Sequence, residues 1–479
     1  MPNLFASLAL ATFPVFAIAL FLFCRPRTAV ALTLMIGEMV LPANHRFDFP
    51  LIPPLDKQTI PILAAMLGAA LFGRKHLRRP LRGSEWFLVA LIVSAFWTVR
   101  TNGDPLRFGP TRLPGETSHD FISETIRIIL YLWAPFYLGR CFFTASRDLI
   151  ALGRMMTVGA LIYTLPILVE IRLSPQLCQW FYGYSAAGFD SVFRWGGYRP
   201  VVFFVNGLFL SVFMLFCTTM TAAMTKARKR IAGLPALPLC LFLCFIVLIC
   251  KSTGTIVYML VFLPLLAFRR PSQVMSIAAI MSIFVLTYPL LRIWDIIPTA
   301  RIGELVSKLS ADRADSLMYR FHMEQGLLDR LRERVAFGWG GYGRNFIWAP
   351  WGQQLTVVDG YAIIELSTKG LVGYTALFGM FLTPVIRALR LFKHIKERSS
   401  RYLVCGLTLV IAILMLDFTV NAPLNPFLTM LVGALSGAVP GIITEEKRSP
   451  PQQVAAPRAR EDERFVPGAP QPSARETFA

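Results

Sequence analysis

Charged residues are scarce in this sequence. Only 16% of its 479 residues are Asp, Glu, Lys or Arg, whereas 55% are hydrophobic. A water-soluble domain would carry roughly 25% charge, so much of the apolar surface of this chain must face lipid. Apolar runs near the roughly 20 residues that cross a bilayer recur along the chain. The sequence therefore predicts one membrane domain and excludes a series of soluble domains.

Motifs for nucleotides and metals are also missing. The sequence contains no Walker loop, no dinucleotide fingerprint and no metal-binding pair of histidines. Its eight cysteines show neither a disulfide framework nor a zinc-site spacing. The net charge of +20 is spread over short clusters and forms no basic, aromatic-rich module for nucleic acids. We therefore expect no metal, no cofactor and no nucleic-acid partner.

The basic clusters alternate with apolar segments in a way that predicts topology. Clusters lie at residues 74–82, 226–230 and 387–401, with smaller pairs at 25–27 and 269–270. If about 13 apolar segments alternate across the bilayer, all of these clusters fall on one side, which the positive-inside bias makes cytoplasmic. We predict an all-α fold, a polytopic transmembrane helix bundle of about 12–13 spans.

Four regions follow from this pattern. We expect N-terminal transmembrane helices in residues 1–293, one large periplasmic loop in 294–360, C-terminal transmembrane helices in 361–443 and a disordered cytoplasmic tail in 444–479. Within the loop, apolar residues at helical spacing over 301–335 predict amphipathic helices that lie over the outer membrane face.

Two glycine-containing stretches are expected to interrupt regular structure. The Gly-aromatic run Gly338–Gly343 should end the loop helices as irregular backbone. The apolar segment 361–386 is too long for an upright span. Its first part, Tyr361–Lys369, is therefore expected to form an outer half-helix that ends at Gly370.

Polar residues inside predicted spans are costly and are functional candidates by default. These residues are Glu38, Glu124, Arg127, Glu365, Lys369 and Asp417. An alternative reading is local pairing, because Glu124 and Arg127 are three residues apart and Glu365 and Lys369 are four apart.

Cations on the predicted outer side form a second set of candidates. Arg194 and Arg199 flank a Trp-Gly-Gly-Tyr stretch, and Lys251 begins a tight turn between two spans. Arg320 lies on a loop helix and Arg344 follows the Gly-rich run. Guanidinium groups bind phosphate oxygens in a bidentate fork, so such cations suit a lipid diphosphate. Ordinary loop solubility is the alternative.

Asp359 stands at the junction between the loop and the span that begins near residue 361. A carboxylate there could act as general base toward a sugar hydroxyl. Asp is also a good N-cap residue for the helix that follows. The residues alone leave both roles open.

The order of four motifs resembles the O-antigen ligase and polymerase superfamily of bacterial envelopes, over most of residues 85–440. The motifs are Arg194-Trp-Gly-Gly197 with Asn206 after it, Ser252-Thr-Gly254, Arg320 with Phe337-Gly-Trp-Gly340, and Asp359-Gly360 with Gly370-Leu-Val-Gly373. Two positions depart from the ligases: Thr253 stands where they have an arginine, and Asp359 where they often have a histidine. The departures favour a polymerase or another exopolysaccharide branch.

The resemblance implies a metal-independent, inverting glycosyltransferase that polymerises or ligates undecaprenyl-diphosphate-linked glycan. It implies a multi-pass protein of the bacterial inner membrane whose active face is periplasmic, with other polysaccharide assembly and export proteins as partners. Asp359 and Arg320 would be catalytic. The diphosphate or glycan would be bound by Arg194, Arg199, Lys251, Tyr342 and Arg344. The alternative function is a polysaccharide or lipid-linked-sugar transporter, although no internal repeat typical of transporters is visible.

Overall fold

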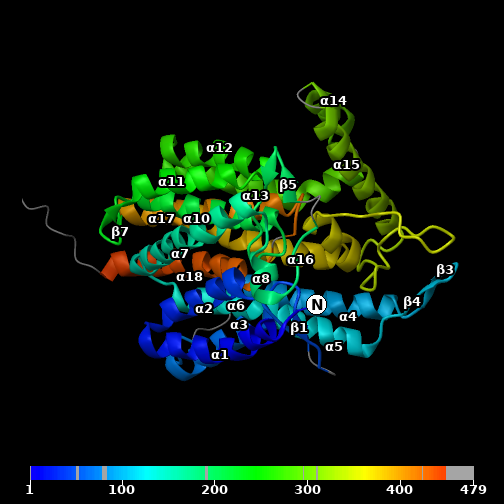
Figure 1. Ribbon diagram of the computed structural model, residues 1–479, viewed down its shortest axis with the longest axis horizontal. Coiled ribbons are helices and arrows are strands. Elements are labelled where there is room, and N and C mark those ends of the chain that lie inside the picture. Colours follow the sequence, from blue (N-terminus) through cyan, green and yellow to red (C-terminus); the bar gives the residue numbers. More distant parts are fainter. Residues whose placement is uncertain are drawn as a thin grey trace, which may run out of the picture.

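The chain folds into helices that run back and forth between the two ends of one bundle (Figure 1). The computed structural model describes residues 2–49, 53–77, 83–188, 192–294, 296–308, 311–422 and 424–448. Within these residues, eight helices are long and apolar enough to cross a membrane. The all-α, multi-span prediction is thereby confirmed at this coarser level, whereas the number of spans stays a prediction.

The helices of the N-terminal half are mostly apolar. They are α1 (Leu4–Phe23), α2 (Pro26–Val40), α3 (Thr59–Phe72), the short η1 (Gly83–Glu85), α4 (Trp86–Thr101), the continuous rod α5, η2 and α6 (Ser118–Arg127, Ile128–Trp133, Ala134–Phe142), α7 (Ser146–Leu173), α8 (Leu177–Tyr182) and α10 (Gly207–Lys226).

The later helices include the two that belong to the long loop. They are α11 (Ala236–Ile249), α12 (Thr253–Phe268), α13 (Pro271–Ile293), α14 (Thr299–Ser307), α15 (Ala311–Leu331), α16 (Tyr361–Leu391), η3 (Phe392–His394), α17 (Arg398–Asp417) and α18 (Pro426–Arg448).

The described strands are short and form two-stranded hairpins between helices. They are β1–β2 (Arg46–Phe47, Leu55–Asp56), β3–β4 (Leu106–Phe108, Thr111–Leu113), β5–β6 (Phe193–Arg194, Gly197–Tyr198) and β7–β8 (Arg230–Ile231, Leu234–Pro235), each antiparallel.

Contacts between connections define the two ends of the bundle. At one end, which we call the basic end, Arg27 pairs with Asp148, Lys226 Nζ donates to the carbonyl of Ala267 at 2.7 Å, and Ser400 donates to Ser146 at 2.8 Å. The other end, which we call the loop end, carries β3–β4 and the long loop before α16 (Figure 1). The segments around the basic residues 25–27, 226–230, 269–270 and 398–401 thus lie at one end, whereas the cluster at 74–82 lies partly outside the described residues.

Small residues let the C-terminal helix approach α6 closely. Gly433, Gly437 and Gly441 recur every fourth residue and lie against backbone carbonyls of the 136–144 segment, where an added Cβ would sit 1.9–2.3 Å from the nearest oxygen. Helices in membranes associate through such small-residue stripes because lipid provides no hydrophobic drive between them. This packing fixes α18 against the rod that carries the polar residues of α5.

The long helix α16 is broken at Gly370. This residue has φ 64° and ψ −173°, which no helix contains, so Tyr361–Lys369 is a half-helix as predicted. In an unbroken helix, the carbonyls of Ser367 and Thr368 would accept from the N–H groups of Leu371 and Val372. The break leaves these four backbone groups without their helical partners.

Loop backbone supplies the missing partners. The N–H groups of Trp339 and Gly340 donate to Ser367 and Thr368 at 3.0 and 2.9 Å. Those of Leu371 and Val372 donate to the carbonyls of residues 335 and 336 at 2.8 and 3.1 Å. The Gly-rich run is therefore irregular, as predicted, and its backbone completes the broken helix.

The loop between α13 and α16 contains the two expected helices, α14 and α15. They project sideways from the bundle, across the direction of the long helices (Figure 1). Leu305 of α14 and Tyr319 of α15 expose large apolar surfaces on this projection, and Trp294 does so at the end of α13. That these helices lie on the outer membrane face stays a prediction.

The predicted tail begins later than its composition indicated. Helix α18 continues through Arg448, so residues 444–448 are helical rather than disordered. These residues are held by contact with the start of α17. There the Glu446 carboxylate accepts the N–H groups of Lys396 and Glu397 at 2.7 and 3.1 Å. The remaining predicted tail, 449–479, lies outside the described residues.

Replacement of Gly370 by Ala should destabilise the fold. An added Cβ would lie 2.4 Å from the backbone of Ala336 and Phe337, and the residue would keep a left-handed φ. Together these effects are worth about 3 kcal/mol or more. The apparent Tm of the purified protein should fall clearly, whereas Gly254→Ala, with open space around its Cβ, should leave it unchanged. Equal melting temperatures would contradict the role of the break.

Candidate functional site

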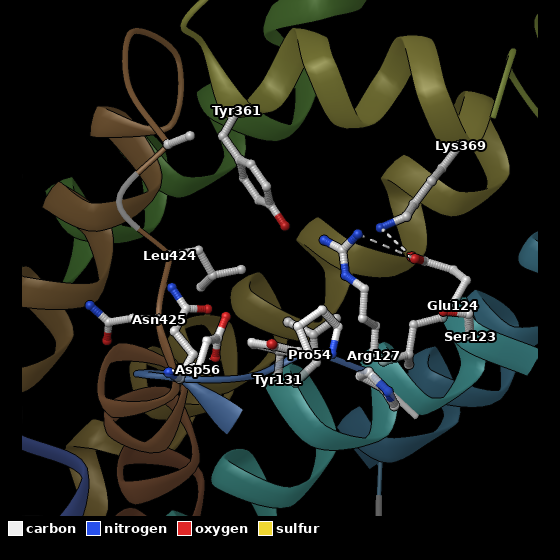
Figure 2. A pocket seen from close by; sticks show the side chains of 15 residues that line it. Pro54, Asp56, Ser123, Glu124, Arg127, Tyr131, Tyr361, Lys369, Leu424 and Asn425 are labelled. Carbon is white, nitrogen blue, oxygen red and sulfur yellow. Dashed lines mark hydrogen bonds and ion pairs between the residues drawn. The ribbon is translucent and has the colours of Figure 1, made fainter. Parts of the chain in front are cut away.

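Two cavities of about 400 Å³ each lie at the loop end. The first, which we call the turn cavity, is bounded by Pro53–Gln58, residues of α5 and η2, Tyr361 and Asn425 (Figure 2). The second, which we call the loop cavity, is bounded by α4, α5, Gly340–Tyr342 and the half-helix of α16. Both are lined by Ser123, Glu124, Arg127 and Lys369, so they adjoin each other.

Four charged side chains separate the cavities and form one network. Lys369 Nζ lies 2.6 Å from the Glu365 carboxylate and 3.1 Å from that of Glu124, and Arg127 lies 3.7 Å from Glu124. Figure 2 shows Arg127 and Lys369 converging on Glu124. Both pairs expected from helical spacing form, and Lys369 joins them across two helices. We call these four residues the charge network.

The broken helix explains where this network sits. Lys369 is the last residue before Gly370, and Ser94 of α4 donates to its carbonyl at 3.3 Å. A cation at the C-terminal end of a half-helix also meets favourable partial charge from the exposed carbonyls. Of the other wall residues, Tyr361 points its hydroxyl into the turn cavity (Figure 2).

The two predicted catalytic residues lie together. Arg320 of α15 and Asp359 form an ion pair at 3.8 Å, with side chains 41% and 60% exposed. The N-cap of α16 is Gly360 rather than Asp359, so the capping alternative for Asp359 is wrong. Because Asp359 is not engaged as the cap, its carboxylate is placed for contact with Arg320 and solvent.

A buried polar group holds α15 in this position. Glu324 accepts from the Tyr288 hydroxyl at 2.7 Å and lies 3.7 Å from Arg292, whose guanidinium also donates to the carbonyl of Phe321 at 3.0 Å. Burial raises the pKa of Glu324, and the hydrogen bond from Tyr288 opposes this shift. These contacts fix the helix turn that carries Arg320.

Arg194, Arg199 and Lys251 form a separate group beside β5–β6. Arg199 donates twice to the carbonyl of Lys251, at 3.0 and 3.3 Å. The ammonium of Lys251 lies against Gly197, where an added Cβ would be 2.3 Å from Nζ. The Nε of Arg194 is buried and has no hydrogen-bond partner among the described residues. Arg199 and Lys251 thus lie together and the backbone of Arg194 pairs with Gly197 beside them, although none of the three lines the two cavities described above.

A buried carboxylate positions the segment that follows β6. Glu170 of α7 accepts the N–H groups of Val201 and Val202 at 2.7 Å each, and that of Leu177 at 3.2 Å. Backbone N–H groups that point at one carboxylate fix a chain segment much as they would at a helix start. Sequence reasoning missed this role, because residue spacing does not reveal which backbone N–H groups a carboxylate will meet in the fold.

Arg344 has a structural environment. Its side chain is fully buried and donates to the carbonyls of Asp104 and Pro114 at 2.6 and 2.9 Å, and its Nη2 lies 3.3 Å from the Asp104 carboxylate. These bonds tie β3–β4 to the long loop. The predicted contact between Arg344 and substrate has no support from this geometry.

Tyr342 lies where a ligand can reach it. Its side chain lines the loop cavity and its hydroxyl donates to Asp120 at 2.5 Å. The adjacent N–H of Gly341 donates to Glu116 at 2.5 Å. Sequence reasoning missed both carboxylates as cavity residues. The capping box that Asp120 completes with Thr117 can be recognised from the sequence. The cavity beside Asp120 cannot, because it forms only when distant segments fold together.

These features define a multi-pass, all-α membrane protein with charged cavities at one end of its bundle. No family model matches the chain, and no curated protein matches it either.

Replacement of Lys369 should destabilise the protein, because the carboxylates of Glu124 and Glu365 would lose their cationic partner. Breaking a buried ion pair by deleting one partner costs about 3–5 kcal/mol. We expect Lys369→Met to lower the apparent Tm clearly and Lys369→Met with Glu365→Gln to recover part of the loss. A matched exposed pair, Arg332 and Asp329 at 3.7 Å, should give little change when Arg332 becomes Met. Equal effects at both pairs would refute a coupled network.

Replacement of Arg344 should loosen β3–β4. Arg344→Met removes the donors that hold Asp104 and Pro114, so protease should cut the hairpin region faster while the helices stay intact. The readout is limited proteolysis with fragment masses. An unchanged cleavage pattern would show that the guanidinium does not fix this segment.

Proposed function

We propose that the protein is a membrane glycosyltransferase that polymerises or ligates undecaprenyl-diphosphate-linked glycan for O-antigen or exopolysaccharide synthesis. The observation that carries the proposal is the ion pair between Arg320 and Asp359, which come from different elements of the long loop and meet at the loop end. A carboxylate beside a guanidinium, both partly exposed, suits a reaction that deprotonates a hydroxyl near an anionic leaving group.

The proposed reaction is a single inverting displacement without a metal. A hydroxyl of the acceptor glycan attacks the anomeric carbon of the donor, and Asp359 takes its proton. The new glycosidic C–O bond forms as the bond to the diphosphate oxygen breaks, and the lipid diphosphate leaves with the electron pair. Arg320 orients the Asp359 carboxylate and offsets negative charge on the leaving group.

The second cation group supports this assignment. Arg199 and Lys251 meet beside the start of α12, and Arg194, in the adjoining hairpin β5–β6, keeps a buried Nε without a partner within the described chain. A guanidinium with spare donors suits a diphosphate oxygen. In the proposed complex, this group binds the lipid diphosphate, Arg320 faces the oxygen that leaves, and Asp359 takes the proton of the acceptor hydroxyl.

The proposed orientation places the loop end on the periplasmic face of a bacterial inner membrane. Basic connections at the opposite end support it, because positive residues in short loops are retained in the cytoplasm. Lipid-linked glycans would then reach the site from the outer leaflet.

One observation favours a second function, a lipid-linked-sugar or polysaccharide transporter. Transporters bind substrate at discontinuous helices, and α16 is discontinuous at Gly370 beside the charge network. The transferase is preferred because Asp359 lies in the connection just before α16, outside the helix itself, where it pairs with Arg320.

Loss of the Arg320–Asp359 pair should stop polymer formation. In the native host we expect Asp359→Asn and Arg320→Ala each to lower extracellular polymer by about 100-fold, the usual scale of a lost general base. Arg332→Ala is the matched control, since Arg332 is an exposed cation of the same loop. Polymer length and lipid-linked intermediates would be measured together.

The location of the intermediate separates the two functions. Accumulation of single repeat units on the periplasmic face supports the transferase, whereas accumulation on the cytoplasmic face supports the transporter. Normal polymer from both stable variants would refute the proposed site.

A further inference from the structure

The loop cavity has an acidic lining. Its charged wall residues are the carboxylates Glu116, Asp120, Glu124 and Glu365 and the cations Arg127 and Lys369. Both cations already contact Glu124, and Lys369 also contacts Glu365. An anionic ligand would therefore meet excess negative charge, and its repulsion grows where protein excludes water.

One hydrogen-bond acceptor in the wall is unused. Glu116 Oε1 accepts from Gly341, but Oε2 is buried and has no hydrogen-bond partner in the part of the chain that the structure describes. An unpaired buried acceptor costs about 1–3 kcal/mol. A ligand hydroxyl gains this acceptor when the Glu116 side chain turns Oε2 toward the cavity, whereas a phosphate or carboxylate group brings only more acceptors.

Tyr342 adds an aromatic surface in a strained position. Its φ of 57° lies in the left-handed region, which costs about 1–3 kcal/mol for such a residue and tends to occur at functional sites. The hydrogen bond from its hydroxyl to Asp120 holds it there, with the residue 53% exposed. An aromatic face with a polar tip fits a ligand that has both apolar C–H faces and hydroxyl groups.

We propose that the loop cavity binds an uncharged sugar unit through Glu116 and Tyr342 and discriminates against uronic acids and other acidic sugars. The identity of this sugar as part of the glycan substrate rests on the proposed function. The cavity volume of about 400 Å³ falls within the roughly 300–1,000 Å³ typical of small-molecule sites. The diphosphate would bind elsewhere, at the separate cation group beside β5–β6.

The test is direct binding to the purified full-length protein in lipid nanodiscs. Saturation-transfer NMR would compare neutral trisaccharides of glucose, galactose and mannose with matched trisaccharides of their uronic acids. We expect at least one neutral trisaccharide to bind about tenfold more tightly than its uronate, the effect of one unfavourable charge contact. Sugar-free undecaprenyl diphosphate, added to saturation, should leave trisaccharide binding unchanged, because the diphosphate binds at the separate cation group; competition would contradict that separate diphosphate site.

Variants assign the preference to the cavity. Glu116→Gln keeps an acceptor oxygen but removes charge, so it should strengthen uronate binding by about tenfold. Asp120→Asn serves as a second variant should Glu116→Gln fail to fold. Tyr342→Ala should weaken neutral binding, and Asp329→Asn, at an exposed carboxylate of α15, should change nothing.

Three results would overturn the inference: no neutral trisaccharide binds, the uronate binds as tightly as the neutral sugar, or the preference survives in both charge-removing variants. Failure of the proposed function looks different. In that case the Arg320 and Asp359 variants make normal polymer, while the trisaccharide preference of the purified protein remains.

Discussion

The structure of the loop end depends on four backbone hydrogen bonds that cross the break in α16. In the absence of water, an unpaired backbone N–H or carbonyl is too costly to leave inside a membrane domain. Residues 335–340 pack against the break. Their backbone groups pair with the N–H and carbonyl groups that lost their helical partners, at Ser367, Thr368, Leu371 and Val372. The long loop is thus a part of the helix bundle rather than a cover added to it.

This arrangement couples the loop to the polar residues beside it. The break places Lys369 at the end of a half-helix, where it joins Glu124 and Glu365 between the two cavities. The same loop backbone continues into Gly341 and Tyr342, which form the opposite wall of the loop cavity. Thr98 and Asn102 of α4 donate to the carbonyls of Phe337 and Gly338 at 2.7 and 3.0 Å and fix the stretch further.

Composition and basic clusters were sufficient to predict the all-α bundle, because the cost of exposing charge to lipid leaves few alternatives. Helical spacing also predicted the Glu124–Arg127 and Glu365–Lys369 pairs, since these are local contacts. Helical spacing could not predict the ion pair between Lys369 and Glu124, or the contacts through which Arg344 holds Asp104. Both join segments distant in sequence, and periodicity carries no information about such contacts.

The hydrogen bonds across the break also bear on the choice between transferase and transporter. Alternating access moves one group of helices against another around the substrate site, so contacts of a discontinuous helix with the moving part must change in each cycle. Here such a movement would separate Trp339 and Gly340 from the half-helix, and Leu371 and Val372 from the loop. Each bond is worth about 0.5–1.5 kcal/mol even in water, and breaking all four without replacement costs more where the protein excludes water. A half-helix held on both sides of its break is better suited to a fixed site, where preorganised charges serve a reaction at one face.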